Sequence, residues 1–297
     1  MKVLRSPQEA EPAKRAVSIG TFDGVHRGHR AVIGAAVATG LRSAVVTFEP
    51  HPRAVLGYEV QLLASFERRL ELLADAGPDE TLVVEFTPEL SRLLPDEFVA
   101  HVLEPLGTRV VVAGDGFRFG AGRRGDADTL RVLGLDVQPV PLLPGVSSSR
   151  IRELLREGKI GEAAELLGRS PELEGTVVAG DQRGGTLGFP TANLAVSHGL
   201  LVPAHGIYAG QAVVPGGGGP YRTAVSIGVN PHYGGQERRI EAFLLDFAGD
   251  LYGSRLRVEL WQRLRDERAF ASEAELVEQI AHDVEAARAA RPPVSPK

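Results

Sequence analysis

Short apolar runs alternate with segments of helical length in the first half of the chain. The runs are rich in Val, Ile and Ala and have the length of buried strands, at residues 16–19, 44–48, 82–86 and 110–113. Helical patterns lie between them, near residues 27–39, 65–76 and 95–106. Apolar strands that alternate with helices are typical of a parallel sheet covered on both faces. The pattern therefore predicts a doubly wound α/β domain, in which ligands bind beyond the carboxyl ends of the strands.

The pattern changes after residue 168, because the strand-like runs there have no helices between them. They lie at residues 175–179, 206–214, 221–229, 240–247 and 256–261 and are separated by Gly, Pro, Asn and Asp. Consecutive strands of this kind predict an antiparallel sheet or a barrel. A helix is predicted over residues 272–290, with a capping box of Ser272 and Glu275 and an apolar stripe of Leu276, Ile280 and Val284.

The two patterns meet at a predicted domain boundary. Two short helical patterns over residues 148–167, broken at Gly158, lead into the turn-forming segment 168–171. A chain of 297 residues is long enough for two domains that each bury a core of their own. We therefore expect one domain over residues 1–168 and a second over residues 169–297.

Composition narrows the functional classes. Hydrophobic residues make up 43% of the chain and charged residues 24%, and no apolar run approaches the roughly 18 residues of a membrane helix. The formal net charge of −5 is spread almost evenly over the two halves, which argues against nucleic-acid binding. Cysteine is absent and residues 1–15 contain no apolar signal segment, so we expect a cytoplasmic protein. The sequence leaves the oligomeric state open.

A glycine-rich turn with two histidines follows the first predicted strand. Its sequence, GTFDGVHRGH, spans residues 20–29 and leads into a helix. Glycines let a ligand approach the backbone, and the helix N-terminus offers N–H groups to a phosphate. His26 and His29 share one helix face, where two imidazoles can stabilise charge during attack on phosphorus. The alternative is a glycine turn with two surface histidines, and a zinc site fits poorly without Cys or an HExxH motif.

This turn resembles the GxFDGxHxGH signature of the HxGH nucleotidylyltransferases. Three further segments resemble the PHP turn, the FxFG loop and the serine-rich stretch of prokaryotic FAD synthetases, whose first domain adenylylates FMN. They are TFEPHP at 47–52, GDGFRFG at 114–120 and SSSRIR at 147–152. Each alone also fits a proline-rich turn, a loop with packed phenylalanines or a capped helix. Together, in the order of the family, they imply a Rossmann-like adenylyltransferase domain.

The resemblance assigns roles to residues of the first domain. It implies that His26 and His29 are catalytic. The residues implied to bind ATP are Gly20, Thr21, Phe22, Asp23, Gly28, Ser148, Ser149 and Arg152. The residues implied to bind the flavin are Pro50, His51, Pro52, Phe117 and Phe119.

A second series of segments lies in the second half. It consists of LGFPTANL at 187–194, GIY at 206–208, IGVNP at 227–231, EAFLLDF at 241–247 and DLYG at 250–253. This series resembles the riboflavin kinases, a family of six-stranded barrels without a P-loop. The chain agrees with the absence of a P-loop, since its only Gly-Lys pair, Gly158-Lys159, is followed by Ile160 and not by Ser or Thr.

The riboflavin kinase resemblance also implies site residues. Thr191 and Asn193 would hold Mg²⁺ and the ATP phosphates, with Gly188 and Pro190 beside them, and Glu241 would take the proton from the ribityl hydroxyl. The alternatives are a turn stabilised by the Thr and Asn side chains and a solvent-facing carboxylate on a strand.

The resemblance covers residues 16–288 and implies a bifunctional enzyme of flavin biosynthesis. Its substrates would be riboflavin, FMN and ATP, its product FAD, and its metal Mg²⁺. The chain departs from the family at Gly116 (usually Asn or Asp), at Gly145 and Gly185 (commonly Arg), and at His232 and Tyr233, where the family has Thr-Phe. Two alternatives therefore stay open: a kinase whose first domain is slow, altered in specificity or only regulatory, and a flavin-binding protein without turnover.

Overall fold

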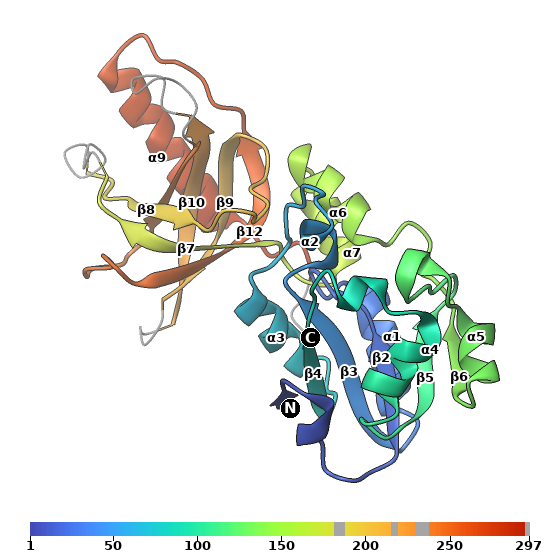
Figure 1. Ribbon diagram of the computed structural model, residues 1–297. Helices are drawn as coiled ribbons and strands as arrows, with labels where there is room; N and C mark the ends of the chain where they lie inside the picture. Colours follow the sequence, from blue (N-terminus) through green and yellow to red (C-terminus); the bar gives the residue numbers. More distant parts are fainter. Residues whose placement is uncertain (181–187, 215–218, 230–237, 295–297) are drawn as a thin grey trace. The chain divides into compact units, whose positions relative to one another are not determined.

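The computed structural model of the chain describes residues 1–180, 188–214, 219–229 and 238–294 and divides into two compact units (Figure 1). The first unit is Met1–Ser148 and the second is Ser149–Lys297. The domain boundary expected at residue 168 stays a prediction. Gly185 and residues 230–233, where the sequence departs from the riboflavin kinases, lie outside the described residues.

The first unit is built on a six-stranded parallel sheet with the order β1-β4-β3-β2-β5-β6. Its strands are β1 (Lys2–Leu4), β2 (Arg15–Ile19), β3 (Arg42–Glu49), β4 (Glu80–Glu85), β5 (Thr108–Gly114) and β6 (Asp136–Val140). The four central strands confirm the four predicted from apolar runs. The sequence pattern misses the edge strands, because β1 has three residues and β6 contains Pro139 and mostly exposed side chains.

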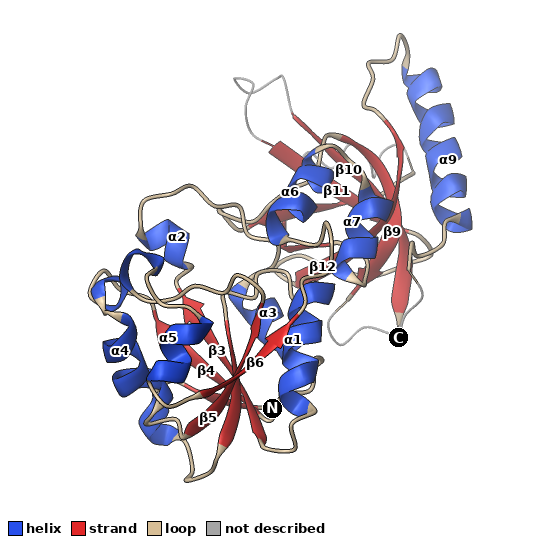
Figure 2. Cartoon of the chain, turned by 90° about the vertical axis from the view of Figure 1, so that its right-hand side faces the viewer, coloured by secondary structure: helices blue, strands red, loops and turns tan. Residues whose placement is uncertain are grey.

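Helices cover both faces of this sheet (Figure 2). On one face, α1 (Arg27–Val37) and α3 (Phe66–Ala74) pack Ile33, Leu72 and Leu73 against β3. On the other face lie α4 (Pro95–Phe98), a π-helix (Val99–Leu103) and α5 (Ala127–Val132). The helix predicted near 95–106 is thus a short α-helical segment continued by a π-helix. This arrangement confirms the doubly wound fold, and the chain order reverses between β2 and β5, where such folds bind ligands.

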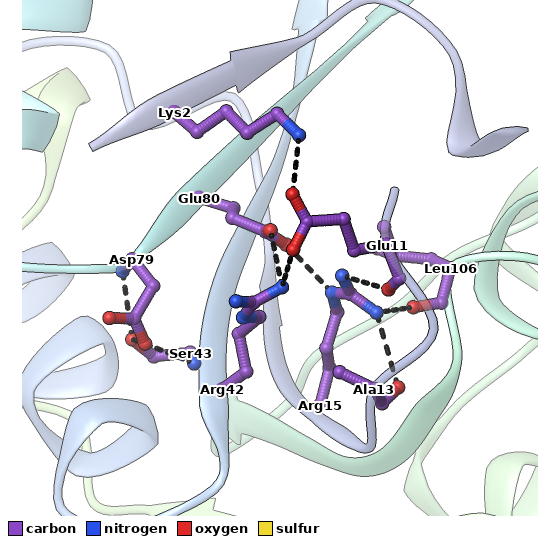
Figure 3. A network of polar contacts seen from close by, with 9 residues as sticks. All are labelled: Lys2, Glu11, Ala13, Arg15, Arg42, Ser43, Asp79, Glu80 and Leu106. Carbon is purple, nitrogen blue, oxygen red and sulfur yellow. Dashed lines mark hydrogen bonds and ion pairs between the residues drawn. The ribbon is translucent and has the colours of Figure 1, made fainter. Parts of the chain in front are cut away.

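A buried ion pair holds the amino-terminal edge of the sheet (Figure 3). Arg15 begins β2 and is 1% exposed, and its Nε donates to the Glu80 carboxylate of β4 at 2.7 Å. Arg42 of β3 lies 3.4 Å from the same carboxylate. The other guanidinium nitrogens of Arg15 donate to the carbonyls of Glu11, Ala13 and Leu106. Because every guanidinium nitrogen has a partner, the charge is tolerated in the interior, and the network joins the starts of three strands.

The second unit is a closed antiparallel barrel with the order β10-β11-β8-β7-β12-β9. Its strands are β7 (Glu172–Val178), β8 (Ala192–Val196), β9 (Gly206–Val213), β10 (Pro220–Val229), β11 (Arg238–Leu244) and β12 (Arg255–Arg265). Along β12, the buried Leu256, Val258 and Leu260 alternate with more exposed residues, as closure of a barrel requires. The six-stranded barrel implied by the sequence is confirmed.

Three helices accompany the barrel. α6 (Ser148–Arg156) and α7 (Ile160–Leu167) precede it, and α9 (Glu273–Ala289) packs on β9 and β10. Ser272 caps α9 as predicted, whereas the Glu275 carboxylate accepts from the N–H of Ala271, one residue before the expected cap. Arg265 and Asp283 form a bidentate ion pair that ties α9 to β12. In the described part of the chain, no helix has the length and apolar character needed to cross a membrane. A short α2 (Pro52–Val55) and 3₁₀ turns at Pro7–Glu9, Leu90–Arg92 and Ala121–Arg123 complete the described helices.

Candidate functional site

The turn between β2 and α1 has backbone φ angles that are unfavourable for most residues. Phe22, Gly24 and Val25 have positive φ angles of 50°, 78° and 39°. Such angles are uncommon for residues with side chains and strained for a β-branched one. The Phe22 ring lies over Gly20, where a Cβ would be 3.3 Å from the ring. The turn therefore folds tightly over the carboxyl end of β2, at the switch point of the sheet.

Two stacked imidazoles stand at the start of α1. The ring centroids of His26 and His29 are 3.6 Å apart and the rings are inclined by 16°. His26 caps the helix, since its Nδ1 accepts a hydrogen bond from the His29 backbone N–H at 3.3 Å. Because Nδ1 is the acceptor, a neutral His26 carries its proton on Nε2. The pair thus lies beside the positive end of a helix of 11 residues, a place suited to a phosphate.

The motif residues Gly28 and Phe22 fix the positions of the two rings. A Cβ at Gly28 would lie 3.2 Å from Cε1 and 3.3 Å from Nδ1 of His26. Phe22 packs edge-on against His29, with ring centroids 5.2 Å apart. The spacing of the sequence motif therefore has a direct geometric cause, because any larger residue at Gly28 would displace the His26 ring.

Burial determines the charge of His29. Desolvation lowers the pKa of His29 well below its usual range, and the neighbouring His26 lowers this pKa further. The His29 Nδ1 atom is buried and has no hydrogen-bond partner among the described residues. The ring is therefore neutral at pH 7.

Asp23 and Ser148, two of the predicted ATP-binding residues, anchor the turn. Asp23 is 1% exposed, and its carboxylate accepts hydrogen bonds from the N–H of Leu63 at 2.9 and 3.2 Å. The Ser148 hydroxyl donates to the Asp23 carbonyl at 3.0 Å. Ser149 and Arg152 belong to α6 and are counted with the second unit, so their ATP-binding role stays a prediction.

The turn predicted to bind the flavin follows β3, the neighbour of β2 in the sheet. It contains Pro50, His51 and Pro52, and the Glu49–Pro50 peptide bond is cis. His51 is 7% exposed, and its Nδ1 accepts from the N–H of Arg53 at 3.2 Å, which caps α2. Since β2 and β3 are parallel neighbours, this turn and the histidine pair lie at the same edge of the sheet.

The two phenylalanines of the FxFG loop have different surroundings. Phe119 is 7% exposed, belongs to the core and packs against Phe98 with centroids 5.9 Å apart. Phe117 stacks on Phe119 at 5.7 Å and lines an open pocket of about 180 Å³ after β5, together with Gly116 and Arg118. Phe117 can therefore contact a ligand in the pocket, whereas Phe119 is buried and packs against the Phe117 ring.

Gly116 and Gly145, where the sequence departs from the FAD synthetases, both have glycine backbones. Their φ angles are 76° and 73°. No atom lies within 4 Å of the place that a Cβ would take at either position. The local backbone therefore suits glycine, and an Arg at position 145 would be strained in this conformation.

Arg69 is a buried residue at this edge that the sequence analysis does not single out. Its guanidinium donates to the carbonyls of Thr21 and Phe48 at 3.3 and 3.1 Å. It lies on the same face of α3 as the buried Leu72 and Leu73. A charged residue at such an apolar position is the signal by which the sequence could have revealed it.

Three predicted site residues lie close together in the second unit: Thr191, directly before β8, Asn193 of β8 and Glu241 of β11. Glu241 of β11 pairs in register with Asn193 of β8. The Thr191 hydroxyl lies 3.5 Å from one oxygen of the Glu241 carboxylate, and Arg239 Nη1 lies 3.4 Å from the other. The Glu241 side chain is 30% exposed. An accessible carboxylate beside a hydroxyl and a cation is suited to accept a proton from a bound alcohol.

The same three side chains offer oxygen atoms that suit Mg²⁺. A hydroxyl, an amide and a carboxylate are hard donors, and Mg²⁺ usually completes its shell with water and phosphate oxygens. The described residues contain no group of three His, Cys, Asp or Glu that could hold a metal by themselves. The Asn193 side chain lies over Gly180, and Gly188, with φ of 86°, and Pro190 lead into β8.

Two family models match the chain, one for each unit. The FAD synthetase model matches residues 8–147, and the riboflavin kinase model matches residues 167–291. Together they cover most of the chain in the order implied by the sequence motifs.

Full-length relatives agree with these models. Proteins named bifunctional riboflavin kinase/FMN adenylyltransferase from Listeria monocytogenes and Bacillus subtilis are 36% and 35% identical, with at least 91% of each chain covered. The protein of that name from Escherichia coli is 35% identical over 97% of both chains. A solved structure titled macrolide-efflux protein from Streptococcus pneumoniae has a TM-score of 0.87 at 29% identity and covers 97% of this chain and 98% of its own. The likeness to that structure extends over both units of the chain.

We expect Gly34→Ala to stabilise the first unit and Gly28→Ala to fail to do so. Ala is favoured over Gly within a helix by about 1 kcal/mol. A Cβ at Gly34 meets no atom within 4 Å, whereas one at Gly28 meets the His26 ring. Denaturant unfolding measures the stabilities, and histidine NMR signals report the ring positions, which only Gly28→Ala should change. Equal stabilisation by both substitutions, with unchanged histidine signals, would contradict the packing described.

We also expect His29 to make the first unit less stable in mild acid. Its folded-state pKa is below that of the unfolded chain, so the unfolded chain binds more protons as the pH falls. The stability contribution is therefore complete above about pH 6.5 and is lost as the pH falls toward the lowered pKa. Unfolding measured from pH 7.5 to 5 should show a smaller pH dependence for His29→Gln than for the parent. Identical slopes would show that His29 is not held neutral by burial.

Proposed function

The chain belongs to the family of bifunctional riboflavin kinases and FMN adenylyltransferases, and we propose that it makes FMN in its second unit and FAD in its first. It is a transferase of flavin biosynthesis that acts on small molecules. Riboflavin and ATP give FMN and ADP, and FMN and ATP give FAD and pyrophosphate. The observation that carries the proposal is the presence of two distinct sites in the matching units: the stacked histidines at a helix N-terminus, and Glu241 beside Thr191. A cytoplasmic location stays a prediction.

In the first unit, a phosphate oxygen of FMN attacks the α-phosphorus of ATP. A new P–O bond forms, the bond to the β-phosphate breaks, and pyrophosphate leaves with the extra negative charge. We expect the Nε2–H of His26 and the N-terminal end of α1 to stabilise this charge, because preorganised donors of this kind lower the barrier. The neutral His29 fits beside His26 because two stacked cations would repel each other.

In the second unit, the ribityl hydroxyl of riboflavin attacks the γ-phosphorus of ATP. Glu241 accepts the proton of that hydroxyl, and Nη1 of Arg239 lies 3.4 Å from the same carboxylate. Mg²⁺, when bound, would neutralise the ATP phosphates, and the oxygens of Thr191 and Asn193 would hold it. Phosphoryl transfer needs positioning and charge neutralisation more than covalent help, and the in-register pair of Asn193 and Glu241 supplies the positioning.

One alternative rests on a specific observation in the first unit. Gly116 lines the pocket beside Phe117 and has no side chain where the FAD synthetases carry an amide or a carboxylate. The first unit would then be slow, altered in its nucleotide or flavin specificity, or only a regulatory flavin site. Among the described residues of the kinase site, every residue that the riboflavin kinase resemblance implies is present.

Chromatography of the products separates these possibilities. The purified chain is incubated with Mg-ATP and either riboflavin or FMN, and riboflavin, FMN and FAD are resolved over time. FAD from both substrates supports the proposed function. A reaction that ends at FMN supports the alternative, and no product from either substrate overturns both.

We predict that Glu241→Gln and His29→Gln separate the two activities. Glu241→Gln keeps the shape but removes the proton acceptor, so riboflavin phosphorylation should fall by about 100-fold or more. His29→Gln should lower FAD formation from FMN by about 100-fold. Each variant is the folding control of the other, because the activity of the unaltered unit should persist. A Glu241→Gln protein with full kinase activity would show that another group takes the proton.

A further inference from the structure

We infer that Arg69 is a positioning residue of the adenylyl-transfer site, which holds the turn at the ATP phosphates at a fixed distance from the turn at the flavin. This inference rests on the proposed function of the first unit. It concerns a side chain that lies behind both turns.

The contacts of Arg69 join two loops that are far apart in the sequence. Its Nη1 donates to the carbonyl of Thr21, which belongs to the turn that precedes His26. Its Nη2 donates to the carbonyl of Phe48 at 3.1 Å and to the carboxylate of Glu49 at 2.5 Å, directly before the turn at Pro50. The two halves of one guanidinium thus hold the ends of β2 and β3 together.

A second contact strengthens the same junction. The hydroxyl of Thr47 on β3 also donates to the Thr21 carbonyl, at 3.2 Å. Thr47 is fully buried and Arg69 is 2% exposed, so neither contact is replaced by water. The Thr21 carbonyl is therefore fixed from both sides, and with it the start of the turn that places the two histidines.

The shape of arginine is necessary for this role. A guanidinium is planar and presents its donors in a rigid fork, whereas a lysine ammonium is a single point at the end of a flexible stem. Lysine can reach one of the two loops but cannot fix the distance between them. In-line attack of one substrate on the other requires reacting atoms at about 3–3.5 Å, and a misplacement of about 1 Å can lower the rate about 100-fold.

Arg69 also differs from the purely structural Arg15 at the opposite edge of the same sheet. All three guanidinium nitrogens of Arg15 have partners. The Nε of Arg69 is buried and has no hydrogen-bond partner among the described residues. An arginine that leaves a donor unpaired in the interior is not optimal for stability, so its position is explained better by the two loops that it joins.

The test compares Arg69→Lys with Arg15→Lys in the full chain. For each variant, kcat and the KM values for FMN and ATP are measured for FAD formation, and riboflavin phosphorylation serves as the internal control. We expect Arg69→Lys to raise both KM values and to lower kcat about 10-fold to 100-fold, with kinase activity unchanged. Arg15→Lys should lower the unfolding midpoint and leave both KM values unchanged, because a structural loss only reduces the amount of folded enzyme.

The outcomes are distinct. If Arg69→Lys behaves like Arg15→Lys, with unchanged KM values, the inference is wrong and Arg69 only stabilises the unit. If the first unit of Arg69→Lys does not fold, Glu49→Gln replaces it: a raised KM for FMN supports the inference, and an unchanged KM overturns it. A parent chain that makes no FAD from FMN overturns the proposed function of this unit and the inference with it.

Discussion

All six strands of the first unit run in the same direction, and the placement of its site depends on this constraint. Parallel strands bring every carboxyl end to one edge, so turns from residues 20, 50 and 115 meet although they are distant in the sequence. The opposite edge, where the strands begin, is occupied by the paired charges of Arg15, Arg42 and Glu80. The ion pairs that join the strand starts thus lie at the edge opposite to the candidate site.

At the edge of the candidate site, packing sets the geometry of the histidine motif. Gly20 accommodates the Phe22 ring, Gly28 accommodates the His26 ring, and Phe22 packs against His29. Burial then keeps His29 uncharged, which allows two imidazoles to stack at the positive end of a helix. The strained backbone at Val25 lies two residues after Asp23, which is anchored by the Leu63 N–H and by the Ser148 hydroxyl.

The sequence predicted what depends on local patterns and missed what depends on distant contacts. The apolar runs revealed the four central strands, and the motifs predicted the two candidate sites, whose roles stay predictions. The edge strands β1 and β6 lack an apolar run, since an edge strand buries little and pairs on one side only. Arg69 was missed because its partners, Thr21 and Phe48, are 48 and 21 residues away. The difference between Phe117 and Phe119 likewise appears only once the core is assembled.

The register between β8 and β11 couples correct folding of the barrel to the position of Glu241. Side chains alternate between the two faces of a strand, so Ile240 and Ala242 are buried while Glu241 between them is accessible. A slip of one residue would force the carboxylate into the apolar interior and expose its neighbours, and the barrel would not close. A chain that has closed its barrel has therefore already placed Glu241 opposite Asn193, so barrel closure and assembly of the candidate kinase site occur together.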